Sequence, residues 1–110
     1  MDLLQGTLDM LVLRTLAAGP LHGYGIAKNI RSTSGEALDI EFGSLYPALK
    51  RLEAKGWIGS SWDTSEHKRR AKYYTLTEVG RKKLAQEHSR WADFVNAVAR
   101  IMGPAPGTKA

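Results

Sequence analysis

Residues 43–58 (GSLYPALKRLEAKGWI) combine hydroxyl, small and cationic side chains in an order suited to a helix that reads DNA. Leu45, Leu49 and Leu52 recur at i, i+4 and i+7, which predicts one buried stripe on a short amphipathic helix. Lys50 and Arg51 fall on other faces, where a cation can reach bases or phosphates in a major groove about 12 Å wide. The alternative is an ordinary solvated face with two surface cations.

Three residues predict where this helix begins and ends. Ser44 can cap it by accepting hydrogen bonds from free backbone N–H groups. Pro47 is expected in the first turn, where a proline is tolerated because backbone N–H groups there have no hydrogen-bond acceptor within the helix. Gly56 is the glycine at which we expect the helix to stop.

Two extended runs follow, at residues 57–63 and 70–76, and both are rich in Trp, Ile, Thr and Tyr, which predicts a hairpin. The connecting segment 64–69 contains no glycine, so a loose tip is expected instead of a tight turn. Arg70 and Lys72 are placed to contact phosphates or a minor groove, since cations there gain from counterion release. The other interpretation is that these cations only prevent an edge strand from pairing with another chain and aggregating. Ile58, Tyr74 and Leu76 are expected to close the core.

The distribution of charge favours the DNA interpretation. The chain has 110 residues, with 16 Lys and Arg against 11 Asp and Glu, a net charge of +5. Ten of these cations but only four of the acids lie between Lys50 and Lys83, so this segment carries +6 and the remainder −1. Positive charge gathered on a helix and the hairpin behind it indicates a polyanionic partner.

Two further helices are predicted ahead of the DNA-reading helix. Apolar residues at helical spacing place the first over residues 7–18, capped either by Thr7 or by a capping box of Asp2 and Gln5. The second spans about residues 23–32 and stops at Gly35. Residues 38–40 are expected to pair briefly as an edge strand.

The start of the second helix contains residues that invite a functional interpretation. Gly23 and Gly25 each weaken a helix by about 1 kcal/mol relative to Ala, so close packing or close approach of a ligand should require them. Tyr24 is either a half-buried aromatic with a partner for its hydroxyl or a phosphate contact. His22 is interpreted as structural or exposed, because no second ligand lies at metal-binding spacing.

A longer helix is predicted from residue 78 to residue 102, and one apolar seam runs along it. The seam residues are spaced 4, 3, 4, 3 and 4 apart, a heptad pattern, and they are Leu84, His88, Trp91, Val95, Val98 and Met102. So small a domain cannot cover this helix, which predicts a dimer through the same helix of a second copy. Folding back onto the first helix can supply part of the contact. His88 is expected to pair across the two-fold axis or with Glu87.

These elements together predict a mainly α (α+β) fold: a winged helix-turn-helix with a two-stranded wing and a long C-terminal dimerisation helix. The expected organisation is a DNA-binding domain over residues 1–77, the dimerisation helix over 78–102 and a disordered tail over 103–110. One compact domain suits a chain of this length.

Other function classes are disfavoured by composition. There is no cysteine, and no secretory signal or membrane-length apolar run is present, so a soluble, cytoplasmic protein is expected. Neither a metal nor another cofactor is expected. Scattered histidines argue against an enzyme. The alternative retained is a winged-helix protein-protein interaction module without DNA binding, and an RNA binder lacks the arrayed stacking aromatics.

Three segments in this order resemble signatures of PadR-type bacterial transcriptional regulators: residues 21–25 (LHGYG), 45–53 (LYPALKRLE) and 72–80 (KYYTLTEVG). The resemblance covers roughly residues 4–85, and the single C-terminal helix resembles the short subfamily. It implies a homodimeric repressor acting at palindromic operators. It also implies DNA contacts from the helix within residues 43–58 and from the wing, here Ser44, Tyr46, Pro47, Arg51, Arg70 and Lys72.

Trp91 lies centrally on the predicted seam, where a two-fold axis would bring two copies together. Some PadR-type regulators bind flat aromatic ligands between such residues. A small aromatic effector held by Trp91 is therefore one interpretation, and plain interface packing is the simpler one.

Overall fold

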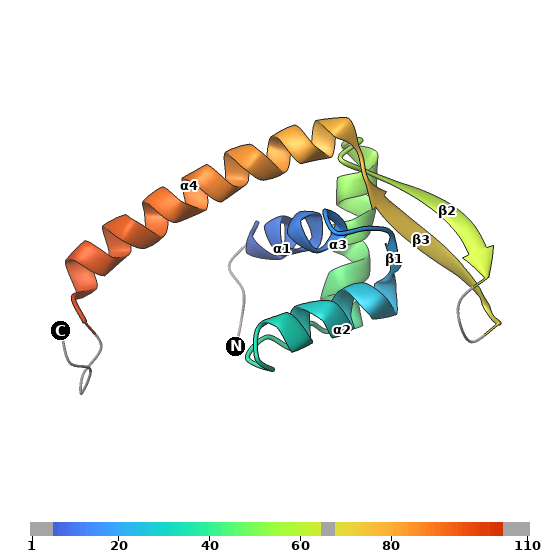
Figure 1. Ribbon diagram of the computed structural model, residues 1–110, viewed down its shortest axis with the longest axis horizontal. Coiled ribbons are helices and arrows are strands. Elements are labelled where there is room, and N and C mark those ends of the chain that lie inside the picture. Colours follow the sequence, from blue (N-terminus) through green and yellow to red (C-terminus); the bar gives the residue numbers. More distant parts are fainter. Residues whose placement is uncertain (1–5, 65–67, 105–110) are drawn as a thin grey trace.

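The computed structural model describes residues 6–64 and 68–104. Within these residues the elements follow in the order α1 (Thr7–Leu16), β1 (Leu21–His22), α2 (Gly23–Thr33), α3 (Phe42–Ala54), β2 (Ile58–Thr64), β3 (Arg70–Leu76) and α4 (Glu78–Met102). The three short helices gather beside the sheet, and α4 extends away from them as a long arm (Figure 1). The predicted mainly α fold, a winged helix-turn-helix with a long C-terminal helix, is confirmed.

The core forms where α1, α2 and α3 meet the root of the hairpin. The predicted stripe of Leu45, Leu49 and Leu52 is fully buried, and each such side chain contributes about 1.5 to 3 kcal/mol. Ile58 and Tyr74 are buried as predicted, and Leu76 packs against them. The other buried core residues are Val12, Leu13, Leu16, Ile26, Ile30 and Ile40.

The third strand of the sheet comes from a segment that was not predicted to be a strand. Strands β2 and β3 form the expected antiparallel hairpin, in register from Ile58 opposite Leu76 to Thr64 opposite Arg70. Strand β1 pairs with the other edge of β3, giving the order β1-β3-β2. A strand of two residues has no alternating pattern long enough to be seen in the sequence.

Residues 38–40 are not a strand, so this prediction was wrong. The edge of β3 that remained open is taken by β1. Instead, the backbone N–H of Leu38 donates to Ser34 Oγ at 3.0 Å, and Ile40 inserts its side chain into the core. The segment between α2 and α3 is therefore held in place by this hydrogen bond and by the burial of Ile40, without strand pairing.

Helix α1 begins without a side-chain cap. Gly6 occupies the N-cap with φ of 90°, so Thr7 is the first helical residue and not the cap. The alternative box of Asp2 and Gln5 lies outside the described residues. The helix ends at Leu16, two residues earlier than predicted, whereas α2 matches its prediction and ends before Gly35, whose φ is 65°.

Helix α3 begins earlier than Ser44 predicts. Glu41 is the N-cap and makes no side-chain capping bond, so Ser44 is the third helical residue and the predicted cap was wrong. The ring of Phe42 packs on Tyr46 at 5.8 Å between centroids, which favours the extra residues. Pro47 then lies beyond the first turn and leaves the Gly43 carbonyl without its usual helical donor. The predicted stop is confirmed, with Gly56 at φ 75°.

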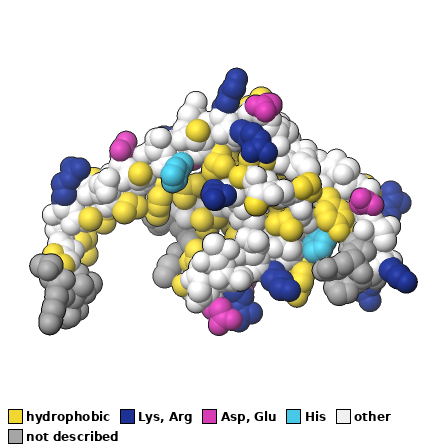
Figure 2. All heavy atoms as spheres, viewed as in Figure 1, with side chains coloured by type: hydrophobic (Ala, Val, Ile, Leu, Met, Phe, Trp, Pro, Cys, Tyr) yellow, Lys and Arg dark blue, Asp and Glu magenta, His cyan; other side chains and the backbone are white. Residues whose placement is uncertain are grey.

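Helix α4 has the predicted bounds, and its apolar side chains are covered only near its start. Leu84 packs against the core, whereas exposed apolar residues continue to the end: Trp91, Phe94, Val95, Val98, Ile101 and Met102. Figure 2 shows hydrophobic side chains along the inner side of the arm. Among the described helices, none is both long and apolar enough to cross a membrane. Residues 105–110 of the expected tail lie outside the described residues.

Candidate nucleic-acid interface

Helix α3 presents a polar face away from its buried leucines. The residues of this face are all exposed, and they are Ser44, Tyr46, Pro47, Lys50 and Arg51. Their exposure follows from the 3.6-residue period, because Leu45, Ala48, Leu49 and Leu52 take up the inner side. The predicted outer face is therefore exposed, and the short side chains of Ser44 and Pro47 allow close approach of a partner there.

Tyr46 joins this face to the start of α2. A Cβ added to Gly23 would lie 2.7 Å from the Tyr46 hydroxyl oxygen and 3.0 Å or less from two ring carbons. While Tyr46 holds this position, residue 23 has no room for a side chain, which is the close packing predicted for Gly23. The tyrosine ring therefore lies over the first residue of α2.

His22 and Tyr24 flank that glycine and have different roles. Nδ1 of His22 accepts a hydrogen bond from the Gly25 backbone N–H at 3.0 Å, so His22 caps α2. Its ring meets the Tyr73 ring edge-on at 5.3 Å between centroids. Tyr24 is 60% exposed, which contradicts its interpretation as half-buried and leaves it available to a phosphate.

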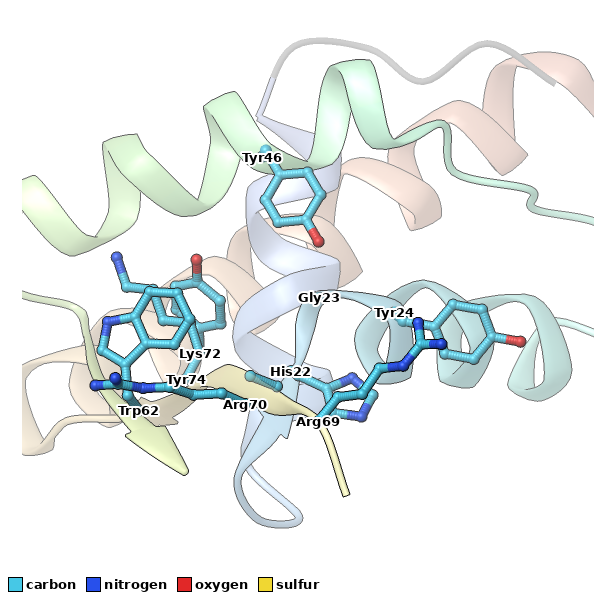
Figure 3. A pocket seen from close by; sticks show the side chains of 10 residues that line it. His22, Gly23, Tyr24, Tyr46, Trp62, Arg69, Arg70, Lys72 and Tyr74 are labelled. Atoms are coloured by element: carbon cyan, nitrogen blue, oxygen red, sulfur yellow. The ribbon is translucent and has the colours of Figure 1, made fainter. Parts of the chain in front are cut away.

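An open pocket of about 740 Å³ lies between α3, the start of α2 and the hairpin. Figure 3 shows the side chains that surround it, with Tyr46 reaching down from α3 toward Gly23. The predicted residues Tyr24, Tyr46, Arg70 and Lys72 line it together. The described side chains of this lining include aromatic rings and cations but no carboxylate: His22, Tyr24, Tyr46, Trp62, Arg69, Arg70, Lys72 and Tyr74.

Lys72 is held at the base of this pocket by a carboxylate from α3. Its Nζ lies 3.3 Å from Glu53 Oε1 and 5.6 Å from the centre of the Tyr74 ring. Ser60 Oγ donates to the other Glu53 oxygen. The Ser60 hydrogen bond, and then the Lys72 ammonium, hold the pKa of Glu53 below its ordinary value of 4.5. Burial raises the pKa of the Tyr74 phenol.

Arg51 lies outside the pocket and contacts α1. Its Nη2 is 2.9 Å from Oδ1 of Asp9 on α1, while half of the arginine side chain remains exposed. Ser44, Pro47 and Lys50 also lie outside the pocket. The predicted DNA-contacting residues thus form two adjoining groups: an exposed helix face and a pocket lined by the hairpin.

Sequence reasoning missed several residues of this surface. Trp62 was assigned only to a strand, although it has the same parity as the core residue Ile58 on β2, which was a usable signal. Asp9 and Glu53 were not connected with Arg51 and Lys72, because ion pairs between distant segments leave no local pattern. The tip residue His67 lies outside the described residues, and Lys68 has a positive φ of 58°.

The seam on α4 adjoins two shallow grooves. Trp91 and Phe94 pack at 5.9 Å between ring centroids and line a groove of about 370 Å³ with Thr7 and Met10 of α1. His88 is exposed and lines a second groove with Leu84 and with Arg14 of α1. Of the two partners expected for His88, Glu87 is the wrong one, because it contacts Lys83 at 3.0 Å and Arg90 at 3.4 Å. Pairing of His88 across the two-fold axis stays a prediction.

Comparison with known proteins gives consistent matches. Residues 12–86 match the model of the transcriptional regulator PadR-like family. A transcriptional regulator from Clostridium thermocellum is 34% identical with a TM-score of 0.79, covering 87% of this chain and 93% of that one. A PadR family regulator from Clostridium difficile R20291 is 30% identical with a TM-score of 0.76, covering 89% and 100%. The negative transcriptional regulator PadR of Bacillus subtilis is 31% identical over 70% of this chain, which spans 42% of that relative.

Proposed function

The chain belongs to the PadR-like family of transcriptional regulators, and on that premise we propose that it is a sequence-specific DNA-binding repressor acting as a homodimer on inverted-repeat operators. The observation that carries the proposal is the junction of the exposed α3 face with a pocket whose described side chains carry no acid. Proteins recognise duplex DNA by combining base contacts in a groove with cation contacts to phosphates. A cytoplasmic location is part of the proposal.

The proposed contacts divide by position. Ser44, Tyr46, Pro47 and Arg51 of α3 enter the major groove, where Arg51 can form a bidentate pair with a guanine edge. Lys50 and Tyr24 contact the flanking phosphates. Arg70 and Lys72 contact the backbone beside the wing. In this division DNA contacts belong to residues 1–77 and dimerisation belongs to residues 78–102.

Dimerisation through α4 is supported by its uncovered apolar face. Trp91, Val95 and Val98 are each more than a third exposed, although all three are residues that proteins usually bury. A second α4 lying antiparallel along this seam would cover them without changing the core of either subunit. His88 and Met102 would lie toward the two ends of the same interface, and Leu84 would join it to the core.

Selection of bound duplexes from a random pool tests the proposal directly. We expect recovered sites to be inverted repeats whose half-sites lie one helical turn apart, roughly 34 to 36 Å, because each subunit presents one α3. Recovery of unrelated sequences at low salt would contradict specificity. Failure to retain any duplex would favour the protein-interaction module instead.

Ligand response is the second part of the proposal. The groove beside Trp91 and Phe94 would be joined to its symmetry mate at the proposed dimer axis, where flat aromatic compounds could stack on paired rings. Such a compound would alter DNA binding only if it bound two dimer shapes with unequal affinity. Fluorescence titration with phenolic and flat cationic compounds, beside Trp91→Ala, tests this. Quenching that survives the substitution would leave Trp91 as interface packing.

A further inference from the structure

Trp62 on β2 is exposed in a place where the core does not explain it. Its side chain is 59% exposed, and it lines the pocket between the hairpin and α3. Trp62 shares this pocket with the exposed rings of Tyr24 and Tyr46, and a group of exposed aromatic residues on one surface marks an interaction site. In the part of the chain that the structure describes, Trp62 belongs neither to the buried core cluster nor to the partly buried residues packed against it.

The strand register shows which way Trp62 faces. Side chains alternate along a strand, and directly opposed residues share a face of the sheet. Ile58 and Tyr74 are buried against the helices, and Ser60 is opposite Tyr74. Two residues farther out, Trp62 is opposite Lys72, so both extend this inner face beyond the core.

Charge follows the same alternation. Arg70 is opposite Thr64 on the inner face, and its guanidinium carbon lies 5.3 Å from the centre of the Trp62 ring. Asp63 is opposite Ala71 on the outer face. The inner face of the outer hairpin thus presents an indole between two cations, and Figure 3 shows Trp62, Arg70 and Lys72 grouped on one side of the pocket.

We infer that Trp62 is a DNA-contact residue, which packs its indole against the sugar-phosphate backbone beside the groove occupied by α3 and aligns Arg70 with a phosphate. The inference rests on the proposed function. It adds an apolar contact with DNA to the contacts that the cations make with phosphates. Deoxyribose carbons supply the apolar partner that the indole lacks in the free protein. The ring also limits the motion of the guanidinium, so less conformational entropy is lost when Arg70 pairs.

Substitutions separate this role from simple charge. Trp62→Ala should weaken duplex binding roughly tenfold, because a large apolar contact is lost. Its salt dependence should change little, since the indole carries no charge, whereas Arg70→Ala should make the log-log salt slope about 0.9 less steep per subunit. Trp62→Phe should retain most of the affinity. Ser61→Ala, which alters the outer face next to Trp62, is the matched control and should bind as wild type.

Shielding of the indole gives a second readout. Acrylamide quenching of the wild type and of Trp62→Phe, each with and without duplex, isolates the Trp62 signal by difference. We expect this signal to become protected on DNA binding. If the wild type binds DNA but Trp62→Ala binds equally well and the indole stays accessible, the inference is wrong while the proposed function stands. If the wild type binds no duplex, the proposed function itself has failed.

Discussion

Gly80 of α4 lies so close to the backbone carbonyl of Trp57 that a Cβ on residue 80 would sit 2.0 Å from the carbonyl oxygen. Thr77, just before α4, binds the same segment: its backbone N–H donates to the Trp57 carbonyl oxygen at 3.1 Å. Its Oγ1 lies 2.7 Å from the Gly56 carbonyl oxygen and 3.0 Å from that of Trp57, and its single proton is donated to one of the two. Lys55 and Lys83 place their ammonium groups 4.5 and 5.1 Å from the centre of the Trp57 ring. The first turn of α4 is therefore fixed to the start of the hairpin.

Gly80→Ala should destabilise the fold by about 1 to 3 kcal/mol or more, because the new methyl group meets backbone that cannot rotate away. Urea denaturation followed by circular dichroism measures this. Gly43→Ala is the matched control: a Cβ there meets nothing within 4 Å, so the substitution should be neutral or slightly stabilising. Equal midpoints for Gly80→Ala and the wild type would show that the junction is not close-packed.

Acid should weaken the link between α3 and the hairpin. The folded state holds the pKa of Glu53 below its ordinary value of 4.5, so the carboxylate stabilises the fold above that pH. This contribution is lost as pH falls through the lowered folded value. The wild type should therefore lose stability toward low pH more steeply than Glu53→Gln, as measured by denaturation midpoints across a pH series. Parallel pH curves for the two proteins would contradict this account.

Asp9 should compete with DNA for Arg51. Exposed ion pairs are worth about 0.2 to 1 kcal/mol, so Asp9→Asn should raise duplex affinity by up to about fivefold. Arg51→Ala should cost about 1 to 3 kcal/mol and relax sequence preference. In the double substitution the Asp9 effect should vanish, which binding titrations can measure. A gain that persists without Arg51 would mean that Asp9 acts only through net charge.

The parts of the fold that could be predicted from the sequence are those whose residues repeat at short intervals along the chain. The leucine stripe of α3 and the heptad seam of α4 repeat within a few residues, so periodicity identified both. Ser44 was mistaken for a cap because the packing of Phe42 on Tyr46 lengthens the helix beyond the polar signal. The contact between Asp9 and Arg51 joins residues 42 apart in the chain, and no local pattern records such a pair.

Val95→Glu should convert the proposed dimer into a folded monomer. The substitution would place two carboxylates against each other in a desolvated interface, at a cost of several kcal/mol. Val95 is 43% exposed in the isolated subunit, so the core should be unaffected. Sedimentation equilibrium measures the mass, and Ala97→Glu, on the opposite side of α4, should leave the dimer intact. A wild-type chain that sediments at 12.1 kDa would remove the dimer from the account.

The most direct measurement of the central claim is the affinity for duplex DNA as a function of salt concentration. If each subunit neutralises three or four phosphates, the log-log slope should be roughly −5 to −7 for the dimer, at about −0.9 per phosphate. Lys72→Ala should weaken operator and scrambled duplexes alike and make the slope less steep by about 0.9 per subunit. A steep slope with preference for the operator is the predicted result, and a flat titration, or no binding at low salt, would contradict it.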